Sequence, residues 1–135
     1  MTRIKIVKAY LWIFGVLAFL WWPMGHWVYP GWYHTLLGFE AFEPAYVKVI
    51  GTLAVMPVMG IFIIAANPLG NRAMMIALLI LTVLMIATYV HLIATHQFPV
   101  GEYLNVGVLG ANTIVLGLLY PWKQANIKSL EESSE

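Results

Sequence analysis

The sequence lacks cysteine altogether and contains little charge. Without cysteine, disulfides, thiolate metal sites and cysteine nucleophiles are excluded. Charged residues make up 10% of the chain, whereas a soluble domain carries about 25%. Hydrophobic residues make up 61%, so most of the surface of the folded chain must face lipid rather than water. A length of 135 residues predicts a single domain.

The sequence also lacks the common motifs of catalysis and of nucleic-acid binding. It contains no nucleophile elbow, no phosphate-binding loop and no basic patch. Four histidines are present, but His91 and His96 are five residues apart, so they do not form the four-residue spacing of a helical metal site. A single histidine could still bind a haem or chlorophyll axially. We therefore predict no catalytic or metal site and no nucleic-acid partner, and the cofactor stays open.

What the sequence does contain is four long apolar runs, at about residues 6–24, 46–66, 73–94 and 103–122. Each run is close to the roughly 20 residues that cross about 30 Å of hydrocarbon as a helix. The runs are continuously apolar rather than alternating, and four strands cannot close a membrane barrel, so helices are predicted. The first run has the length of a signal-peptide core, but Trp21-Trp22-Pro23 is a poor cleavage site, which favours a first membrane helix.

Short connections between the later runs predict antiparallel neighbours. Asn67 to Arg72 reads as a tight turn, and Thr95 to Glu102 contains two helix breakers, Pro99 and Gly101. The predicted fold class is all-α: a transmembrane four-helix up-down-up-down bundle with a long aromatic outer loop between helices 1 and 2. Residues 1–135 form one membrane domain.

The distribution of basic residues predicts the orientation. Six of the seven Lys and Arg residues fall at the N-terminus, in the second loop or at the C-terminus: Arg3, Lys5, Lys8, Arg72, Lys123 and Lys128. An even number of crossings places these regions on one side. By the positive-inside rule, we expect a multi-pass protein of the cell inner membrane with both termini in the cytoplasm. Residues 123–135 are expected to form a polar, mobile cytoplasmic tail.

The long loop is rich in aromatic residues. The stretch from Trp21 to Pro44 holds four of the six tryptophans and no Lys or Arg. One interpretation is an aromatic belt at the membrane interface, and another is a lid over a cavity in the bundle. We predict that residues 27–42 fold back onto the bundle as a short amphipathic segment, with His34 and Glu40 exposed to water. Its apolar stripe would consist of Trp32, Leu36, Phe39 and Phe42.

A few polar residues inside the apolar runs are the candidates for a binding site. His91 lies in the third run, while Asn105, Asn112 and Glu102 share one face of the fourth, which we expect to be turned towards His91. One interpretation is structural, with interhelical hydrogen bonds of about 0.6 kcal/mol each. The other is cofactor binding by these four residues and Lys48. Lys48 either extends its charge to the interface or pairs with a nearby glutamate.

Small residues mark a further pattern on three of the apolar runs. They narrow the last helix at Gly107, Gly110, Ala111 and Gly117, narrow and kink the second at Gly51, Gly60 and Pro57, and mark the first at Gly15 and Ala18. Helices in lipid associate by close packing of their backbones, so these positions are expected at interhelix contacts.

Three segments carry a resemblance to known proteins: "RIKIVKAYLWIFGVLAFLWWPM" near the start, "ANPLGNR" between the second and third runs, and "HLIATH" at the end of the third. With them, the chain resembles a group of small bacterial four-helix membrane proteins that have no established activity. It is also similar in size and architecture to the DoxX-like proteins. It differs from the small multidrug-resistance transporters, because their first helix carries an embedded glutamate and residues 1–39 contain no acidic residue.

These features favour a small integral membrane accessory or interaction subunit of a larger assembly. Its partners would be the lipid bilayer and a protein partner, or a second copy of the chain, within the membrane. The alternative is a membrane module that binds a lipid, quinone, haem or pigment in an outer-side cavity near His91. A third possibility is an enzyme acting on a lipid-soluble substrate with His91 and Glu102 as acid and base.

Overall fold

The computed structural model describes residues 2–132, and every element in this range is a helix. In chain order the elements are α1 (Arg3–Trp21), α2 (Pro23–Trp27), α3 (Pro30–Leu37), α4 (Pro44–Ala66), α5 (Arg72–Ala94), the 3-10 helix η1 (Val100–Glu102), α6 (Tyr103–Leu119) and α7 (Trp122–Glu132). Four helical segments are long and apolar enough to cross a membrane: Arg3–Trp27, Pro44–Ala66, Arg72–Ala94 and Val100–Leu119. The prediction of an all-helical chain with four such segments is confirmed.

Proline and glycine divide the long aromatic segment into short helices. Pro23, Pro30 and Pro44 each begin a helix, where the missing N–H costs nothing and the fixed φ suits the first turn. Gly38 ends α3 in the left-handed conformation, with φ of 89°, which a residue with a side chain adopts at a cost. The side chain of Glu43 then accepts a hydrogen bond from the backbone of α4.

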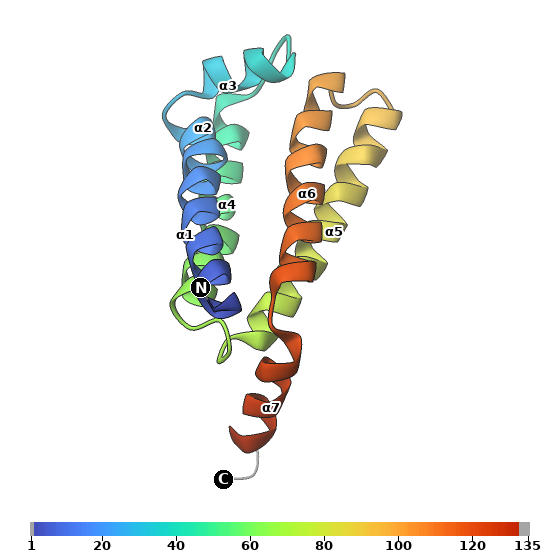
Figure 1. Cartoon of the computed structure of the whole chain (residues 1–135). Helices are drawn as coiled ribbons and strands as arrows, with labels where there is room; N and C mark the ends of the chain where they lie inside the picture. Colours follow the sequence, from blue (N-terminus) through green and yellow to red (C-terminus); the bar gives the residue numbers. More distant parts are fainter. Residues whose placement is uncertain (1, 133–135) are drawn as a thin grey trace.

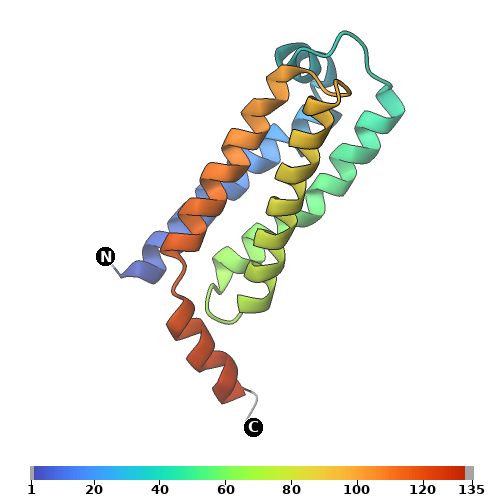
Figure 2. The same cartoon turned by 90° about the vertical axis from the view of Figure 1, so that its right-hand side faces the viewer.

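The long helices form two pairs. Figures 1 and 2 show α1, continued by α2, beside α4, and α5 beside α6. We call the end of the molecule where α3 lies the α3 end, and the opposite end, where α7 leaves the bundle, the α7 end. A short turn joins α4 to α5 at the α7 end, and the two helices diverge towards the α3 end in both views. The two pairs are therefore in closest contact at the α7 end.

Close approach within the first pair depends on glycine. A Cβ atom on Gly15 would lie 2.7 Å from the ring of Phe62, and one on Gly51 would lie 2.8 Å from side-chain atoms of both His26 and Trp27. The glycines of α6 behave differently, because a Cβ atom on Gly107, Gly110 or Gly117 would meet nothing within 4 Å. The expectation that these α6 glycines make interhelix contacts is therefore wrong within this chain. They leave one face of α6 open.

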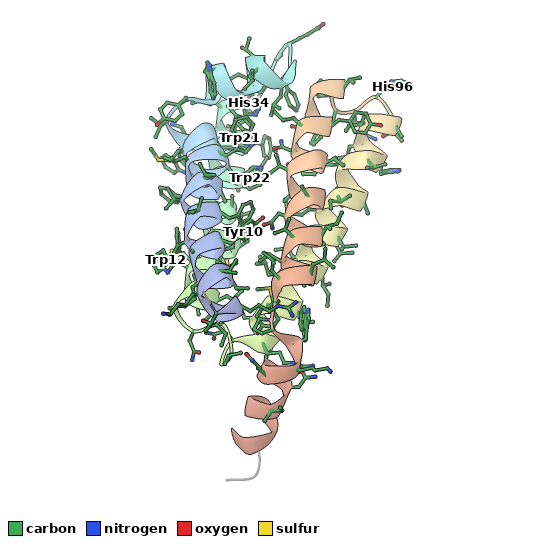
Figure 3. The ribbon with its side chains drawn as sticks, viewed as in Figure 1. Tyr10, Trp12, Trp21, Trp22, His34 and His96 are labelled. Carbon is green, nitrogen blue, oxygen red and sulfur yellow. The ribbon has the colours of Figure 1, made fainter. Side chains whose placement is uncertain are left out.

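Polar side chains connect the two pairs at three depths along α1 and α6. The guanidinium of Arg3 donates to the carbonyls of Leu118 and Leu119, at the end of α6. The hydroxyl of Tyr10 donates to Oδ1 of Asn112 over 2.9 Å, and Nε1 of Trp21 donates to Oδ1 of Asn105 over 2.8 Å. Figure 3 shows Tyr10 and Trp21 reaching from α1 towards α6. These three bridges set the register of the two helices.

The segment after Trp122 is helical rather than irregular. Pro121 cannot continue α6, so the chain turns and restarts as α7, which leaves the bundle (Figure 1). The turn is anchored because the Tyr120 hydroxyl donates to the carbonyl of Pro68 over 2.5 Å, and Nε1 of Trp122 donates to the carbonyl of Gly117. The sequence analysis expected residues 123–135 to form a polar, mobile tail and did not predict the helix α7. Residues 133–135 lie outside the described range.

The packing around Gly51 leads to a test of the first helix pair. Gly51→Ala should lower the free energy of unfolding by about 1–3 kcal/mol, because the added methyl group overlaps His26 and Trp27. Gly107→Ala is the matched control in an open helix position, and it should be neutral or stabilise by up to about 1 kcal/mol. Denaturant titration in detergent micelles, followed by circular dichroism, measures both. Equal effects of the two substitutions would contradict the packing of α2 on α4.

Candidate functional site

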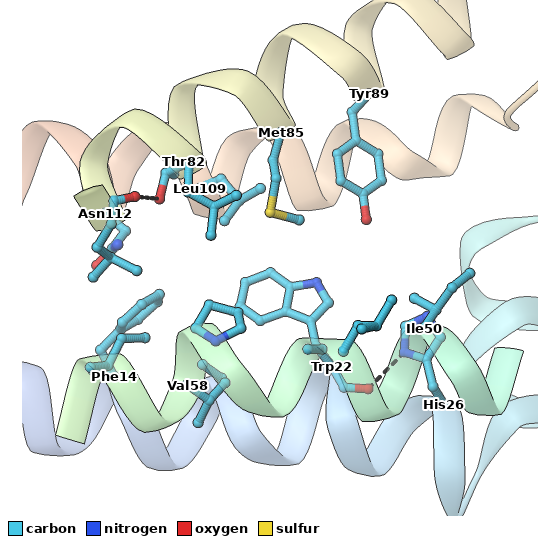
Figure 4. Close-up of a pocket in the computed structure, with 17 residues that line it drawn as sticks. Phe14, Trp22, His26, Ile50, Val58, Thr82, Met85, Tyr89, Leu109 and Asn112 are labelled. Carbon is cyan, nitrogen blue, oxygen red and sulfur yellow. Dashed lines mark hydrogen bonds between the residues drawn. The ribbon is translucent and has the colours of Figure 1, made fainter. Parts of the chain in front are cut away.

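An apolar pocket of about 270 Å³ lies between the two helix pairs. Figure 4 shows its two walls, with Phe14, Trp22 and Val58 on the side of α1 and α4, and Met85 and Leu109 on the side of α5 and α6. Part of the pocket lies between the Tyr10–Asn112 and Trp21–Asn105 bridges, because Phe14 and Ala18 of α1 and Leu109 of α6 line it. Trp22 and His26 extend the lining beyond Trp21 towards the α3 end. The volume is close to the lower end of the roughly 300–1,000 Å³ typical of ligand pockets.

The pocket opens sideways, where α4 and α5 diverge. Ile50 and Leu53 of α4 and Leu81 of α5 line it and are also exposed at the surface. All three side chains are aliphatic and offer no hydrogen bonds to water. In a bilayer this rim would contact hydrocarbon chains. A molecule dissolved in the lipid phase could therefore enter the pocket without passing through water.

Two polar groups at the pocket wall have no partner within the described residues. Nε1 of Trp22 is buried and has no hydrogen-bond acceptor among residues 2–132. The hydroxyl of Tyr89 likewise has no hydrogen-bond partner there, and Figure 4 shows it directed from α5 towards the opposite wall. The other polar side chains of the wall are partly used, since Thr82 donates to the carbonyl of Leu78 and Asn112 accepts from Tyr10.

A buried hydrogen-bonded cluster closes the α3 end of the bundle. Asn105 is fully buried at its centre. Its Oδ1 accepts from Trp21, and its Nδ2 donates to Oε2 of Glu102 over 2.6 Å and to the hydroxyl of Tyr33 over 3.2 Å. The cluster joins α1, α3 and η1 to α6. Burial raises the pKa of the Tyr33 phenol, so this hydroxyl stays protonated at neutral pH.

Two histidines that sequence analysis did not select are buried beside this cluster. His26 and His34 are each 6% exposed, and their ring centroids are 5.4 Å apart. Nδ1 of His26 lies 2.6 Å from the carbonyl oxygen of Trp22, and Nδ1 of His34 lies 2.8 Å from that of Pro30. In both cases the carbonyl is four residues earlier in the chain. A carbonyl only accepts, so Nδ1 of each ring carries a hydrogen and donates it. His26 also lines the pocket, as Figure 4 shows.

The position of His34 corrects the expected orientation of α3. The buried face of α3 consists of Tyr33, His34 and Leu37, whereas Trp32 and Leu36 of the predicted stripe are exposed. The helix begins at Pro30 and ends at Gly38, so Phe39 and Phe42 follow the helix and cannot continue its stripe. Both rings instead pack on His34, and the ring of Phe42 stacks on it with centroids 4.5 Å apart. The sequence did contain a signal for this position, because His34 follows the helix-starting Pro30 by four residues and its ring nitrogen can therefore reach the Pro30 carbonyl.

The structure separates the residues that sequence analysis had grouped. Glu102 and Asn105 lie together in the buried cluster, and Asn112 lines the pocket. His91 is exposed on the far side of α5, so the expectation that the polar face of α6 is turned towards it is wrong. The reason is helical geometry: His91 follows the pocket residue Tyr89 by two positions, or about 200° around the helix.

Lys48 is also outside this group. Its Nζ lies 5.7 Å from the centroid of the Trp27 ring, which is a cation–π distance, and the side chain is exposed. It forms no ion pair within the described residues, so the alternative of a Lys48–glutamate pair is wrong. Among residues 2–127, whose side chains are described, no group of three histidine, aspartate or glutamate side chains is placed to hold a metal ion. The arrangement is thus suited to holding an apolar molecule beside a few hydrogen-bonding groups.

The central position of Asn105 can be tested by comparison with Asn112. Asn105→Leu leaves Trp21, Glu102 and Tyr33 without their shared partner, so it should cost about 3 kcal/mol of stability. Asn112→Leu removes only the acceptor of Tyr10 and should cost about 1 kcal/mol. Thermal unfolding in the same detergent compares the two variants. If both melt at the same temperature, Asn105 does not organise the α3 end.

Comparison with known proteins adds no further information about this pocket or this cluster. The resemblance to DoxX-like and other small bacterial four-helix membrane proteins therefore stays a prediction. Functional conclusions depend on the geometry of the chain itself. No protein-family model, no curated protein and no solved structure matches the chain.

Proposed function

We propose that the chain is a multi-pass membrane protein that holds a lipid-soluble molecule between its two helix pairs. The observation that carries the proposal is the apolar pocket of about 270 Å³, whose exposed lining residues Ile50, Leu53 and Leu81 place its opening between α4 and α5. An empty space of this size is unfavourable in a membrane helix bundle, because the side chains around it lose contacts with neighbouring atoms. An apolar occupant restores those contacts, which supports binding as the role of the pocket.

The proposed site differs in position from the one expected from the sequence. A cavity near His91 is replaced by one bordered by Trp22, His26 and Tyr89, with Asn112 at its other end. Asn105 and Glu102 close the α3 end next to this pocket rather than lining it. Their role in this proposal is to position α1 and α3 around the site, and ligand contact falls to the pocket residues.

A second candidate function is that of an accessory or interaction subunit. The open glycine face of α6 favours it, because Gly107 and Ala111 are exposed four residues apart, as in small-xxx-small helix contacts within membranes. A helix from a protein partner, or from a second copy of the chain, could approach closely along this face. The two functions are compatible, since the pocket opens between α4 and α5 and not across α6.

We further propose an up-down-up-down arrangement in the bacterial inner membrane, with both termini and the α4–α5 turn in the cytoplasm. The support is that α1, α5 and α7 all begin at the α7 end (Figure 1), and near these helix starts lie the basic residues Arg3, Lys5, Lys8, Arg72 and Lys123. A C-terminal alkaline phosphatase fusion should be inactive, and a fusion in the α5–α6 connection should be active, because this reporter works only in the periplasm. The opposite pattern would overturn the orientation.

Filling the pocket tests the binding function directly. Ala54→Phe places a ring in the pocket from α4 and should abolish retention of a bound molecule, whereas Ala87→Phe adds the same ring on an exposed position of α5 outside the pocket. Native mass spectrometry of the full chain released from lipid nanodiscs would show an adduct on the wild type and on Ala87→Phe only. Equal occupancy of Ala54→Phe and wild type would contradict the proposal.

A further inference from the structure

The pocket has a surplus of hydrogen-bond donors at the part nearest the α3 end. Nε1 of Trp22 can only donate, and it is buried without an acceptor among residues 2–132. The hydroxyl of Tyr89, on the opposite wall, is also without a hydrogen-bond partner in that range. Leaving a buried donor unpaired is unfavourable, so an occupant with an acceptor oxygen gains from binding here.

The walls also constrain the charge and shape of the occupant. None of the described residues that line the pocket is Lys, Arg, Asp or Glu, so an ionised head would be desolvated without a counter-charge. Aromatic rings from Phe14, Trp22 and Tyr89 border the space and offer flat apolar faces (Figure 4). An uncharged, planar head with a carbonyl oxygen satisfies both conditions.

A second hollow provides room for a chain attached to that head. A more open groove is lined by Leu84, Thr88 and Leu92 of α5 and by Phe98 of the α5–α6 connection. It shares Leu81, Met85 and Tyr89 with the pocket. The shared residues are four positions apart and therefore form one ridge along the helix. A chain that leaves the pocket over the flexible side chain of Met85 would run into the groove and then into lipid.

We propose that the occupant is an uncharged lipid of the prenylquinone type, with a carbonyl-bearing ring in the pocket and a long apolar chain along the α5 groove. One carbonyl oxygen accepts from Nε1 of Trp22 and from the hydroxyl of Tyr89. This inference rests on the proposed binding function and specifies its ligand class. The carbonyl chemistry is shared with uncharged glycerides, so the two sources must be separated by experiment.

The test measures binding of decylubiquinone to the full chain in nanodiscs, by native mass spectrometry at increasing probe content. Trp22→Phe and Tyr89→Phe should each weaken binding about fivefold, because each removes one donor and keeps the ring. Trp12→Phe and Tyr46→Phe are matched controls at exposed positions outside both hollows, and they should leave the affinity unchanged. Decylbenzene, which has no acceptor, should bind equally to the wild type and to Trp22→Phe.

The outcomes separate this inference from the binding function itself. If Ala54→Phe abolishes decylubiquinone binding but Trp22→Phe and Tyr89→Phe leave it unchanged, the pocket binds lipid and the donor assignment is overturned. If Ala54→Phe binds the probe like the wild type, the binding function fails as well. If dioctanoylglycerol binds more tightly than decylubiquinone and loses affinity in the same two variants, the carbonyl donors are correct and the quinone class is overturned.

Discussion

The contact between α1 and α6 is the constraint on which the architecture depends. In lipid, apolar helix surfaces gain little by touching one another, so polar contacts and close packing decide the arrangement. The side-chain hydrogen bonds that link α1 to α6 are those of Arg3 with Leu118 and Leu119, of Tyr10 with Asn112, and of Trp21 with Asn105. Long side chains make these bridges, so they hold the pairs together while keeping the backbones apart. The pocket occupies the interval that results.

The α3 end is closed by backbone packing as well as by hydrogen bonds. A Cβ atom on Gly101 would collide with the backbone carbonyl of Leu37, so the end of α3 rests directly on η1. Tyr33 then reaches Asn105, and the ring of Trp21 packs edge-on against Tyr33 with centroids 5.4 Å apart. Because this end is blocked by protein, the route from the pocket to its surroundings runs between α4 and α5.

The sequence was sufficient to locate the four membrane-length helices, but not to predict how each helix is rotated about its own axis. Hydropathy locates four segments of membrane-spanning length, because each apolar run is continuous and ends at a proline, a glycine or a polar residue. The same uniformity hides which face of α5 is buried, so His91 could not be distinguished from a pocket residue such as Tyr89. The position of α3 depends on where Pro30 starts the helix, and a shift of two residues exchanges His34 with Trp32 on the buried side. Which face of α6 stays open depends only on how the helices pack against one another, so the sequence pattern could not predict it.

The sideways opening also sets the scale on which binding must be judged. A molecule bound as proposed would enter through the rim of Ile50, Leu53 and Leu81, and it would exchange with the bilayer interior rather than with bulk water. Its occupancy would then follow its mole fraction among the surrounding lipids, and every lipid chain or detergent tail would compete at the same rim. Aqueous solubility becomes irrelevant to affinity, and a protein washed extensively in detergent would lose its occupant by dilution even when the site is intact.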